Sequence, residues 1–294
     1  MRLHFVMPAI LVVMQLLSLT TPTVGLAGDE FDNILQHFEE HLFSSTSSTS
    51  SNSKTLPYRW LKPEFIKSGR KYPLVIFLHG AGERGTDNQI QLQSLPTLLA
   101  QPTYRKKYPC FLVVPQCPSG QSWQQQFPVL LEIIDKVMQE NPIDKRRIYL
   151  TGYSMGAYGT WSLAALRPDL FAAAVPVAGG GNVQTTHQLI DLPIWAVHGN
   201  ADKAVPVSQS REMIKAIRQA GGSPKYTELK GVGHSCWQKA YYDPNSILPW
   251  MFAQKKPWLK FSTESCLITI LLLIDLIVAI WIFKIWRRSV SAIK

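Results

Sequence analysis

The feature that most constrains the fold of this chain is a serine placed between a strand and a helix. Ser154 is the centre of Gly152-Tyr153-Ser154-Met155-Gly156, which follows the apolar run 147–151 and precedes the helix-like stretch 157–166. In this context the turn lifts the serine onto the tip of a strand. The turn forces the serine into strained dihedral angles, and its small neighbours let strand and helix approach closely. The pattern therefore indicates a nucleophile rather than a small-residue turn without chemistry.

Strands and helices alternate along most of the chain. This alternation predicts an α/β fold, a mostly parallel sheet with helices on both faces. Ligands of such sheets bind beyond the carboxyl ends of the strands. The predicted strands span 58–61, 74–78, 111–114, 148–150, 172–177, 194–197 and 226–229, and the predicted helices span 89–100, 127–139, 158–166 and 208–220.

The N-terminal 53 residues are expected to lie outside the main domain. Residues 1–27 have the pattern of a signal peptide, with a basic start, an apolar stretch and a small-residue end, and an uncleaved anchor is the alternative. Residues 28–53 are predicted to form an amphipathic helix over 29–43 and then a Ser/Thr-rich linker or long hairpin loop.

The C-terminal region predicts a membrane anchor. The run Ser265 to Phe283 is almost entirely apolar and long enough to cross a bilayer, after a juxtamembrane segment at 257–264. Asp275 is costly at mid-membrane, so it either faces a partner helix or is a buried, protonated carboxyl. The basic tail 284–294 is expected in the cytoplasm. Together the two ends predict a single-pass membrane protein whose main domain, 54–256, is extracytoplasmic.

Charge and cysteine content add two expectations. The chain of 294 residues has a net charge of +10, but its basic residues are scattered, so a nucleic-acid partner is not predicted. A secreted domain permits disulfides. Cys117 and Cys236 are the pair to test, because both are expected near strand ends on the same edge, whereas Cys266 belongs to the membrane segment.

A serine nucleophile needs a base within hydrogen-bond reach and a third group that orients this base. On α/β-hydrolase scaffolds the chain order is Ser, then Asp or Glu, then His. Three histidines follow Ser154. His187 lies in a polar loop without a preceding strand, and no strand separates His198 from the candidate acids. His234 follows the last strand in a glycine-flanked turn and is the predicted base.

The acid follows from the same reasoning. Asp169 ends the helix after the nucleophile, and Asp191 begins a strand at the wrong edge of the sheet. Asp202 comes directly after the strand 194–197, at a carboxyl end, and is the predicted orienting acid.

The oxyanion of acyl transfer needs preorganised donors, each worth about 3–4 kcal/mol to the barrier. The backbone N–H of Met155, next to the nucleophile, is one candidate. The other is assigned to Ala81, in the loop after the strand 74–78. His79 is expected to brace this loop. This chemistry needs no metal and no organic cofactor.

Five segments in order carry a resemblance to a known group. They are Phe77-Leu78-His79-Gly80-Ala81-Gly82-Glu83-Arg84-Gly85, Pro115-Gln116-Cys117-Pro118, Gly152-Tyr153-Ser154-Met155-Gly156, His198-Gly199-Asn200-Ala201-Asp202 and Gly231-Val232-Gly233-His234. Over about 55–253 the chain resembles the secreted esterases of the α/β-hydrolase superfamily. Related groups are the polyhydroxybutyrate depolymerases, carbohydrate esterases, dienelactone hydrolases and prolyl-oligopeptidase-like domains. The resemblance implies Ser154, Asp202 and His234 as a triad.

The resemblance also implies where a lid would be inserted, between the strands 172–177 and 194–197. This chain has only a short loop there, which predicts an open site suited to exposed acyl groups on larger molecules. Trp123 and Trp237 are candidates to line the cleft. The expected activity is carboxylic-ester hydrolysis through an acyl-enzyme. A serine peptidase of prolyl-oligopeptidase type is an alternative, and a non-catalytic binding protein on this fold is another.

Overall fold

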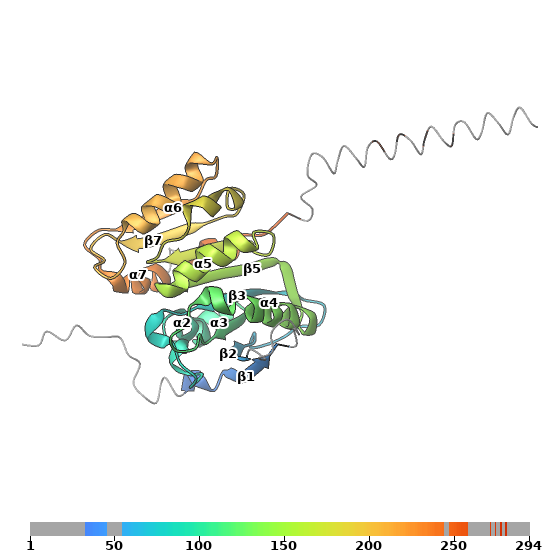
Figure 1. Cartoon of the computed structure of the whole chain (residues 1–294). Helices are drawn as coiled ribbons and strands as arrows, with labels where there is room; N and C mark the ends of the chain where they lie inside the picture. The colour runs from blue at the N-terminus through green and yellow to red at the C-terminus, as the bar shows by residue number, and fades with distance from the viewer. Residues whose placement is uncertain are drawn as a thin grey trace, which may run out of the picture.

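The computed structural model describes residues 33–45, 55–243 and 247–257, together with positions 271, 274, 277 and 280. Its strands form one eight-stranded sheet in the order β1-β2-β4-β3-β5-β6-β7-β8 (Figure 1). β2 pairs antiparallel with both β1 and β4. The strands β3 to β8 all run parallel to one another. The bounds are β1 Phe38–Ser44, β2 Thr55–Leu61, β3 Tyr72–Leu78, β4 Phe111–Pro115, β5 Ile143–Tyr153, β6 Ala173–Val177, β7 Trp195–Gly199 and β8 Lys225–Leu229.

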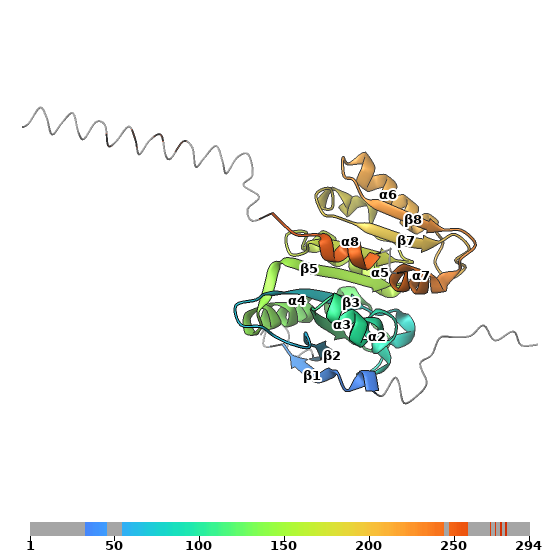
Figure 2. The same cartoon turned by 180° about the vertical axis from the view of Figure 1, so that it is seen from behind.

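Helices cover both faces of this sheet. α4 (Trp123–Glu140), α5 (Met155–Leu166) and α6 (Ser208–Gln219) pack on the face that is towards the viewer in Figure 1. α2 (Leu95–Ala100), α3 (Pro102–Lys107), α7 (Trp237–Tyr242) and α8 (Ile247–Ala253) pack on the other, as Figure 2 shows from behind. Short 3-10 helices interrupt the loops at η1 (Ala81–Glu83), η2 (Ile90–Leu92), η3 (Val183–Gln188) and η4 (His234–Cys236).

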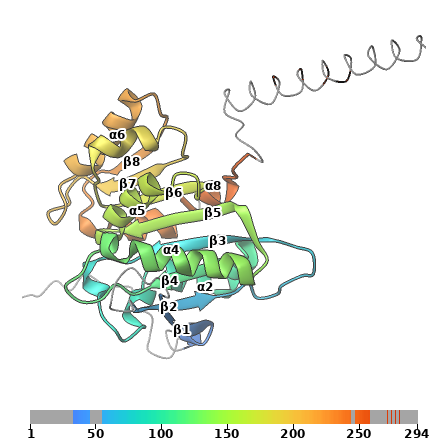
Figure 3. The same cartoon turned by 45° about the vertical axis from the view of Figure 1, so that its right-hand side comes forward.

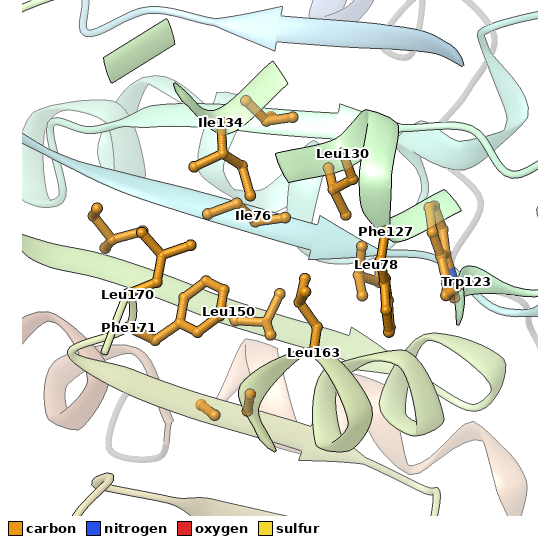
Figure 4. Close-up of a cluster of buried hydrophobic side chains, with 14 of the residues drawn as sticks. Ile76, Leu78, Trp123, Phe127, Leu130, Ile134, Leu150, Leu163, Leu170 and Phe171 are labelled. Atoms are coloured by element: carbon orange, nitrogen blue, oxygen red, sulfur yellow. The ribbon is translucent and has the colours of Figure 1, made fainter. Parts of the chain in front are cut away.

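The core is divided into two layers by the sheet. All seven residues of β3 are buried, and their side chains alternate between the layers: Leu74, Ile76 and Leu78 join one cluster, and Val75 and Phe77 join the other. A strand that is buried on both faces reads as a continuous apolar run, because neither face meets water. Figure 4 shows the first cluster, in which side chains of α4 and α5 meet those of β3 and β5.

The edge strand β1 corrects the helix predicted over 29–43. Residues 33–35 are helical, but Phe38–Ser44 pairs antiparallel with β2 along its full length. His41 stacks on its cross-strand partner Tyr58 with ring centroids 5.0 Å apart. These long-range pairings outweigh the local helical spacing of the apolar residues. Most of the segment predicted to be a Ser/Thr-rich linker or a long hairpin loop lies outside the described residues.

The helix predicted over 89–100 is divided in two. η2 ends at Leu92, and α2 starts only at Leu95. Ser94 between them has a positive φ of 73°, which an α-helix does not contain. Pro96 then occupies the first turn of α2, where its missing N–H costs no hydrogen bond. The helix predicted over 127–139 is longer than expected and starts at Trp123, where the N–H of Ser122 donates to Oε1 of Gln125 at 2.8 Å.

The disulfide considered between Cys117 and Cys236 is not formed. Both cysteines and Cys110 are buried free thiols. Cys117 belongs to the core layer beneath α4 and α5, whereas Cys236 belongs to the layer on the opposite face. Both cysteines follow the carboxyl ends of parallel strands, as expected, but the sheet lies between them, so the considered pairing was wrong.

The terminal predictions fall largely outside the described residues. These include the signal peptide at 1–27, the juxtamembrane segment and the basic tail. Of the predicted span 265–283, only Leu271, Ile274, Ile277 and Ile280 are described, and all four are helical and exposed. Where the structure describes the chain, it contains no helix that is both long and apolar enough to span a membrane. Figure 3 shows the domain with α8 leading to the last of the continuously described residues, 254–257.

Candidate active site

Ser154 lies in a strained turn at the carboxyl end of β5. Its φ of 55° and ψ of −117° are unusual for a residue with a side chain, and α5 begins at the next residue. Its N–H donates to the carbonyl of Val177 on β6 at 2.9 Å. The flanking glycines are required sterically. A Cβ on Gly152 would collide with the backbone of Gly156, and a Cβ on Gly156 would collide with the carbonyl of Leu78.

The structure brings Ser154, His234 and Asp202 together as the sequence predicts. Nε2 of His234 lies 2.9 Å from Oγ of Ser154, and Nδ1 lies 2.7 Å from Oδ2 of Asp202. Because a carboxylate oxygen only accepts hydrogen bonds, Nδ1 carries the hydrogen and Nε2 is free to accept the serine proton. The Asp202 side chain is fully buried, whereas 27% of the His234 side chain is exposed. A substrate can therefore reach the serine and the imidazole, but not the acid.

Several donors keep Asp202 ionised. Burial alone would raise the pKa of its carboxyl group, but the hydrogen bonds from His234 and from the backbone N–H groups of Val205 and Ala204 outweigh burial and lower it. The two backbone bonds converge on Oδ1 at 2.9 and 2.8 Å, which leaves Oδ2 to face the imidazole. The acid is thus held in one orientation by the turn that follows β7.

Ala81 and Met155 each start a helical segment beside the nucleophile. Met155 is the first residue of α5, and Ala81 is the first residue of η1. The N–H groups at a helix start have no acceptor within their own helix. The loop of Ala81 lies against the nucleophile, since a Cβ on Gly80 would be 3.6 Å from Cβ of Ser154. Met155 is thus next to the serine in the chain and the loop of Ala81 packs against the serine turn, so both residues remain the candidates for the oxyanion hole.

His79 braces this loop. Its Nδ1–H donates to the carbonyl of Gly80 at 2.6 Å, and its Nε2 accepts the backbone N–H of Cys117 at 2.9 Å. Burial lowers the pKa of His79 to about 4. The imidazole is therefore neutral at neutral pH, as its acceptor role towards Cys117 requires. It connects the end of β3 to the segment after β4.

The two candidate tryptophans have different positions. Trp123 is fully buried, and its Nε1–H donates to the carbonyl of His79 at 3.0 Å, so it supports the loop and does not line a cleft. The prediction of substrate contact by Trp123 is wrong because α4 starts at this residue and turns its ring into the core. Trp237 is half-buried and packs edge-on against Tyr153, with ring centroids 6.4 Å apart.

Two residues near the site were not predicted from the sequence to belong to it. His198 was rejected as a base, but its Nε2 lies 3.1 Å from Oδ2 of Asp202. Its place in the segment His198-Gly199-Asn200-Ala201-Asp202, four residues before the acid at the same strand end, was the available signal. Tyr153 contacts His234 through its ring and its hydroxyl. Among the described residues, no group of three or more His, Cys, Asp or Glu side chains is arranged to hold a metal ion.

Comparisons with known proteins agree with the fold. The crystal structure of a thermostable esterase superposes with a TM-score of 0.71 at 37% sequence identity, covering 76% of this chain and 64% of the esterase chain. A family model described as the dienelactone hydrolase family matches residues 122–246. The domain has the α/β-hydrolase fold. The matched part of this hydrolase fold contains Ser154, Asp202 and His234.

Two curated relatives cover the α/β-hydrolase domain to different extents. A probable inactive carboxylesterase of Oryza sativa subsp. japonica is 23% identical over 205 residues, which are 60% of this chain and 82% of the relative. A bifunctional acetylxylan esterase/xylanase of Neocallimastix patriciarum is 29% identical over 99 residues, 34% of this chain but only 15% of that enzyme. The chain thus spans a small part of the acetylxylan esterase/xylanase and less than two thirds of the thermostable esterase.

Proposed function

We propose that this chain is a serine hydrolase that cleaves carboxylic esters through an acyl-enzyme. The observation that carries the proposal is the continuous hydrogen-bonded series from Ser154 through His234 to Asp202, with distances of 2.9 and 2.7 Å. An unassisted serine hydroxyl is a weak nucleophile, and this arrangement is the one that activates it.

In the proposed reaction, Oγ of Ser154 attacks the ester carbonyl carbon while Nε2 of His234 takes the serine proton. The carbonyl oxygen becomes an oxyanion that accepts hydrogen bonds from the N–H groups of Ala81 and Met155. Collapse of this intermediate breaks the bond to the alcohol, which leaves with the proton from His234. His234 then takes a proton from water, which attacks the acyl carbon. The bond between this carbon and Oγ of Ser154 breaks, the carboxylic acid leaves, and the proton returns to Oγ. Asp202 stays ionised and stabilises the imidazolium.

The ester class is supported by the relatives and by the accessibility of the site. The matched proteins include a thermostable esterase and an acetylxylan esterase/xylanase. The connection from β6 to β7, where a lid would be inserted, holds only the short helix η3. With His234 partly exposed beside it, the site suits acyl groups that project from larger molecules.

A fluorophosphonate probe tests the proposal on the full-length protein. It should label the wild type, and Ser154→Ala should abolish labelling. Ser162→Ala is a matched control, because Ser162 is also on α5 but bonds Gln124 on the surface. Labelling of this control should equal that of the wild type. A folded wild type that is not labelled would contradict the proposal and favour the binding-protein alternative. One relative of this fold is itself described as a probable inactive carboxylesterase.

Substrate panels separate esterase from peptidase. We expect p-nitrophenyl esters of short acids to be hydrolysed at a rate that requires Ser154. Proline-containing peptides should be hydrolysed far more slowly. The opposite ratio would favour the prolyl-oligopeptidase alternative.

Membrane attachment is part of the proposal. The apolar run 265–283, followed by the basic tail 284–294, supports an anchor that leaves the catalytic domain outside the cytosol. The protein should resist alkaline carbonate extraction, and deletion from residue 265 onward should release it. Protease protection of the two termini decides whether residues 1–27 are cleaved. Recovery of the intact protein in the soluble fraction would contradict the anchor.

A further inference from the structure

The acid of the candidate site faces two imidazoles. Oδ2 of Asp202 lies 2.7 Å from Nδ1 of His234 and 3.1 Å from Nε2 of His198. We propose that His198 is a positioning residue, which holds the Asp202 carboxylate for His234 and, through Ser210, ties it to the turn that carries Ser154. This inference rests on the proposed function.

The role of His198 depends on which of its ring nitrogens carries a hydrogen. Its Nε2 faces two oxygens that can only accept, Oδ2 of Asp202 and the carbonyl of Val205, both at 3.1 Å. Nε2 therefore carries a hydrogen and donates it. Burial lowers the pKa of His198, whose side chain is fully buried, so the neutral form with the hydrogen on Nε2 prevails at neutral pH. Its Nδ1 is then an acceptor.

Ser210 on α6 fixes the other side of the ring. Its Oγ lies 2.8 Å from Nδ1 of His198 and 2.7 Å from the carbonyl oxygen of Gly179, and only 1% of the residue is exposed. The hydroxyl has one hydrogen for these two acceptors, so neutral His198 and Gly179 compete for it. The imidazole cannot rotate without losing either Ser210 or Asp202.

Gly179 brings the network back to the nucleophile. A Cβ on Gly179 would lie 3.1 Å from the carbonyl oxygen of Ser154 and 2.5 Å from Cβ of Ala157, so this loop packs directly on the turn and the start of α5. Contacts thus lead from the Ser154 backbone through Gly179, Ser210 and His198 to Asp202. The acid and the nucleophile are positioned by one connected set of buried groups.

A second donor on Oδ2 also affects His234. Hydrogen bonding to His198 takes up part of the negative charge on the oxygen that faces His234, so loss of His198 should change the pH dependence of the site. Other titratable groups face this network. Glu228, across the β7–β8 pair from His198, is bound by Arg211 at 2.6 and 2.8 Å. The Cys236 thiol and the Tyr158 hydroxyl interact electrostatically with Asp202. The ring of Tyr153 packs against His234.

The test is the pH dependence of Ser154 labelling by a fluorophosphonate, from about pH 5 to about pH 9, across the histidine range. His198→Phe has no hydrogen-bond donor at this position. We expect its labelling rate at high pH to be about tenfold lower, and the midpoint of its labelling rate against pH to rise by about one pH unit. Loss of one hydrogen bond to a charged group implies effects of this size. His198→Gln places an amide N–H near Nε2 and should restore the wild-type midpoint. Ser210→Ala should shift the midpoint upward by less. The matched control is His187→Gln, since His187 is exposed on η3.

The outcomes are distinct. An unlabelled wild type overturns the proposed function and this inference together. A labelled wild type whose rate and midpoint are unchanged in folded His198→Phe and Ser210→Ala overturns the inference alone. A uniform loss of rate without a shift of the midpoint in both variants also overturns it, because it indicates a purely structural role. If His198→Phe does not fold, Ser210→Ala decides between these results.

Discussion

Tyr153 and His234 are joined twice across the candidate site. The Tyr153 hydroxyl donates to the backbone carbonyl of His234 at 3.1 Å, and the two rings lie 5.1 Å apart between centroids. Tyr153 is the residue before the nucleophile, so this contact connects the turn that carries Ser154 to the segment that carries the base. The serine and the imidazole therefore depend on one another for position.

Removal of this hydroxyl is expected to weaken the alignment of the base. In Tyr153→Phe the ring contact remains but the hydrogen bond, worth about 1 kcal/mol, is lost. We expect the rate of fluorophosphonate labelling of Ser154 to fall several-fold, with a similarly small loss in the free energy of unfolding. Tyr104→Phe, a change on α3, on the sheet face away from α4 and α5, should leave the labelling rate unchanged. Equal labelling of both variants would show that the hydroxyl does not position His234.

The closeness of α5 and β3 predicts a large penalty at Gly156. A methyl group there would overlap the carbonyl of Leu78, so Gly156→Ala must move the helix or the strand. Displacements of packed backbone typically cost about 1–3 kcal/mol or more. Denaturant unfolding should show this loss, whereas Gly82→Ala, where a Cβ meets no atom within 4 Å, should be close to neutral. Equal stabilities would contradict the packing of the turn.

Burial of His79 predicts an acid-sensitive contribution to stability. Burial lowers its pKa from the ordinary 6.5 to about 4, so the unfolded chain binds the proton more readily. Neutral His79 thus contributes stability above pH 6.5, which is lost as the pH falls towards about 4. Over this window the free energy of unfolding should fall more steeply in the wild type than in His79→Gln, by up to about 3 kcal/mol. Parallel curves in denaturant titrations would contradict the assigned protonation state.

Trp237 remains the candidate for substrate contact. It is half-buried beside Tyr153, and it follows η4, which carries His234. We expect Trp237→Ala to raise KM for bulky esters several-fold with little change in kcat, because uniform binding is lost. Steady-state kinetics with acids of increasing size provide the measurement. A lower kcat at constant KM would instead assign Trp237 to the support of His234.

The three residues of the candidate site could be predicted because their positions follow from topology. In a parallel sheet, the segments after β5, β7 and β8 all emerge at the same edge. The order Ser154, Asp202, His234 along the chain then left one residue for each role. His198 could not be assigned in this way, because its contact with Asp202 depends on the exact turn after β7.

The features that were mispredicted depend on which sheet face or partner a residue meets. β1 has apolar residues at helical spacing, but pairing with β2 decided its conformation. Trp123 and Cys117 both lie near strand or helix ends, where a cleft or a disulfide was plausible. Their orientation into the core layer beneath α4 is a property of the assembled fold that local sequence does not contain.

The short connection between β6 and β7 bears on how such an enzyme would respond to its substrate's physical state. Within the described residues, this connection carries only η3, and no mobile cap has to be displaced by an oil–water interface before Ser154 is reached. Turnover of a soluble ester should therefore follow a simple saturation curve, with no jump in rate when the ester begins to form micelles.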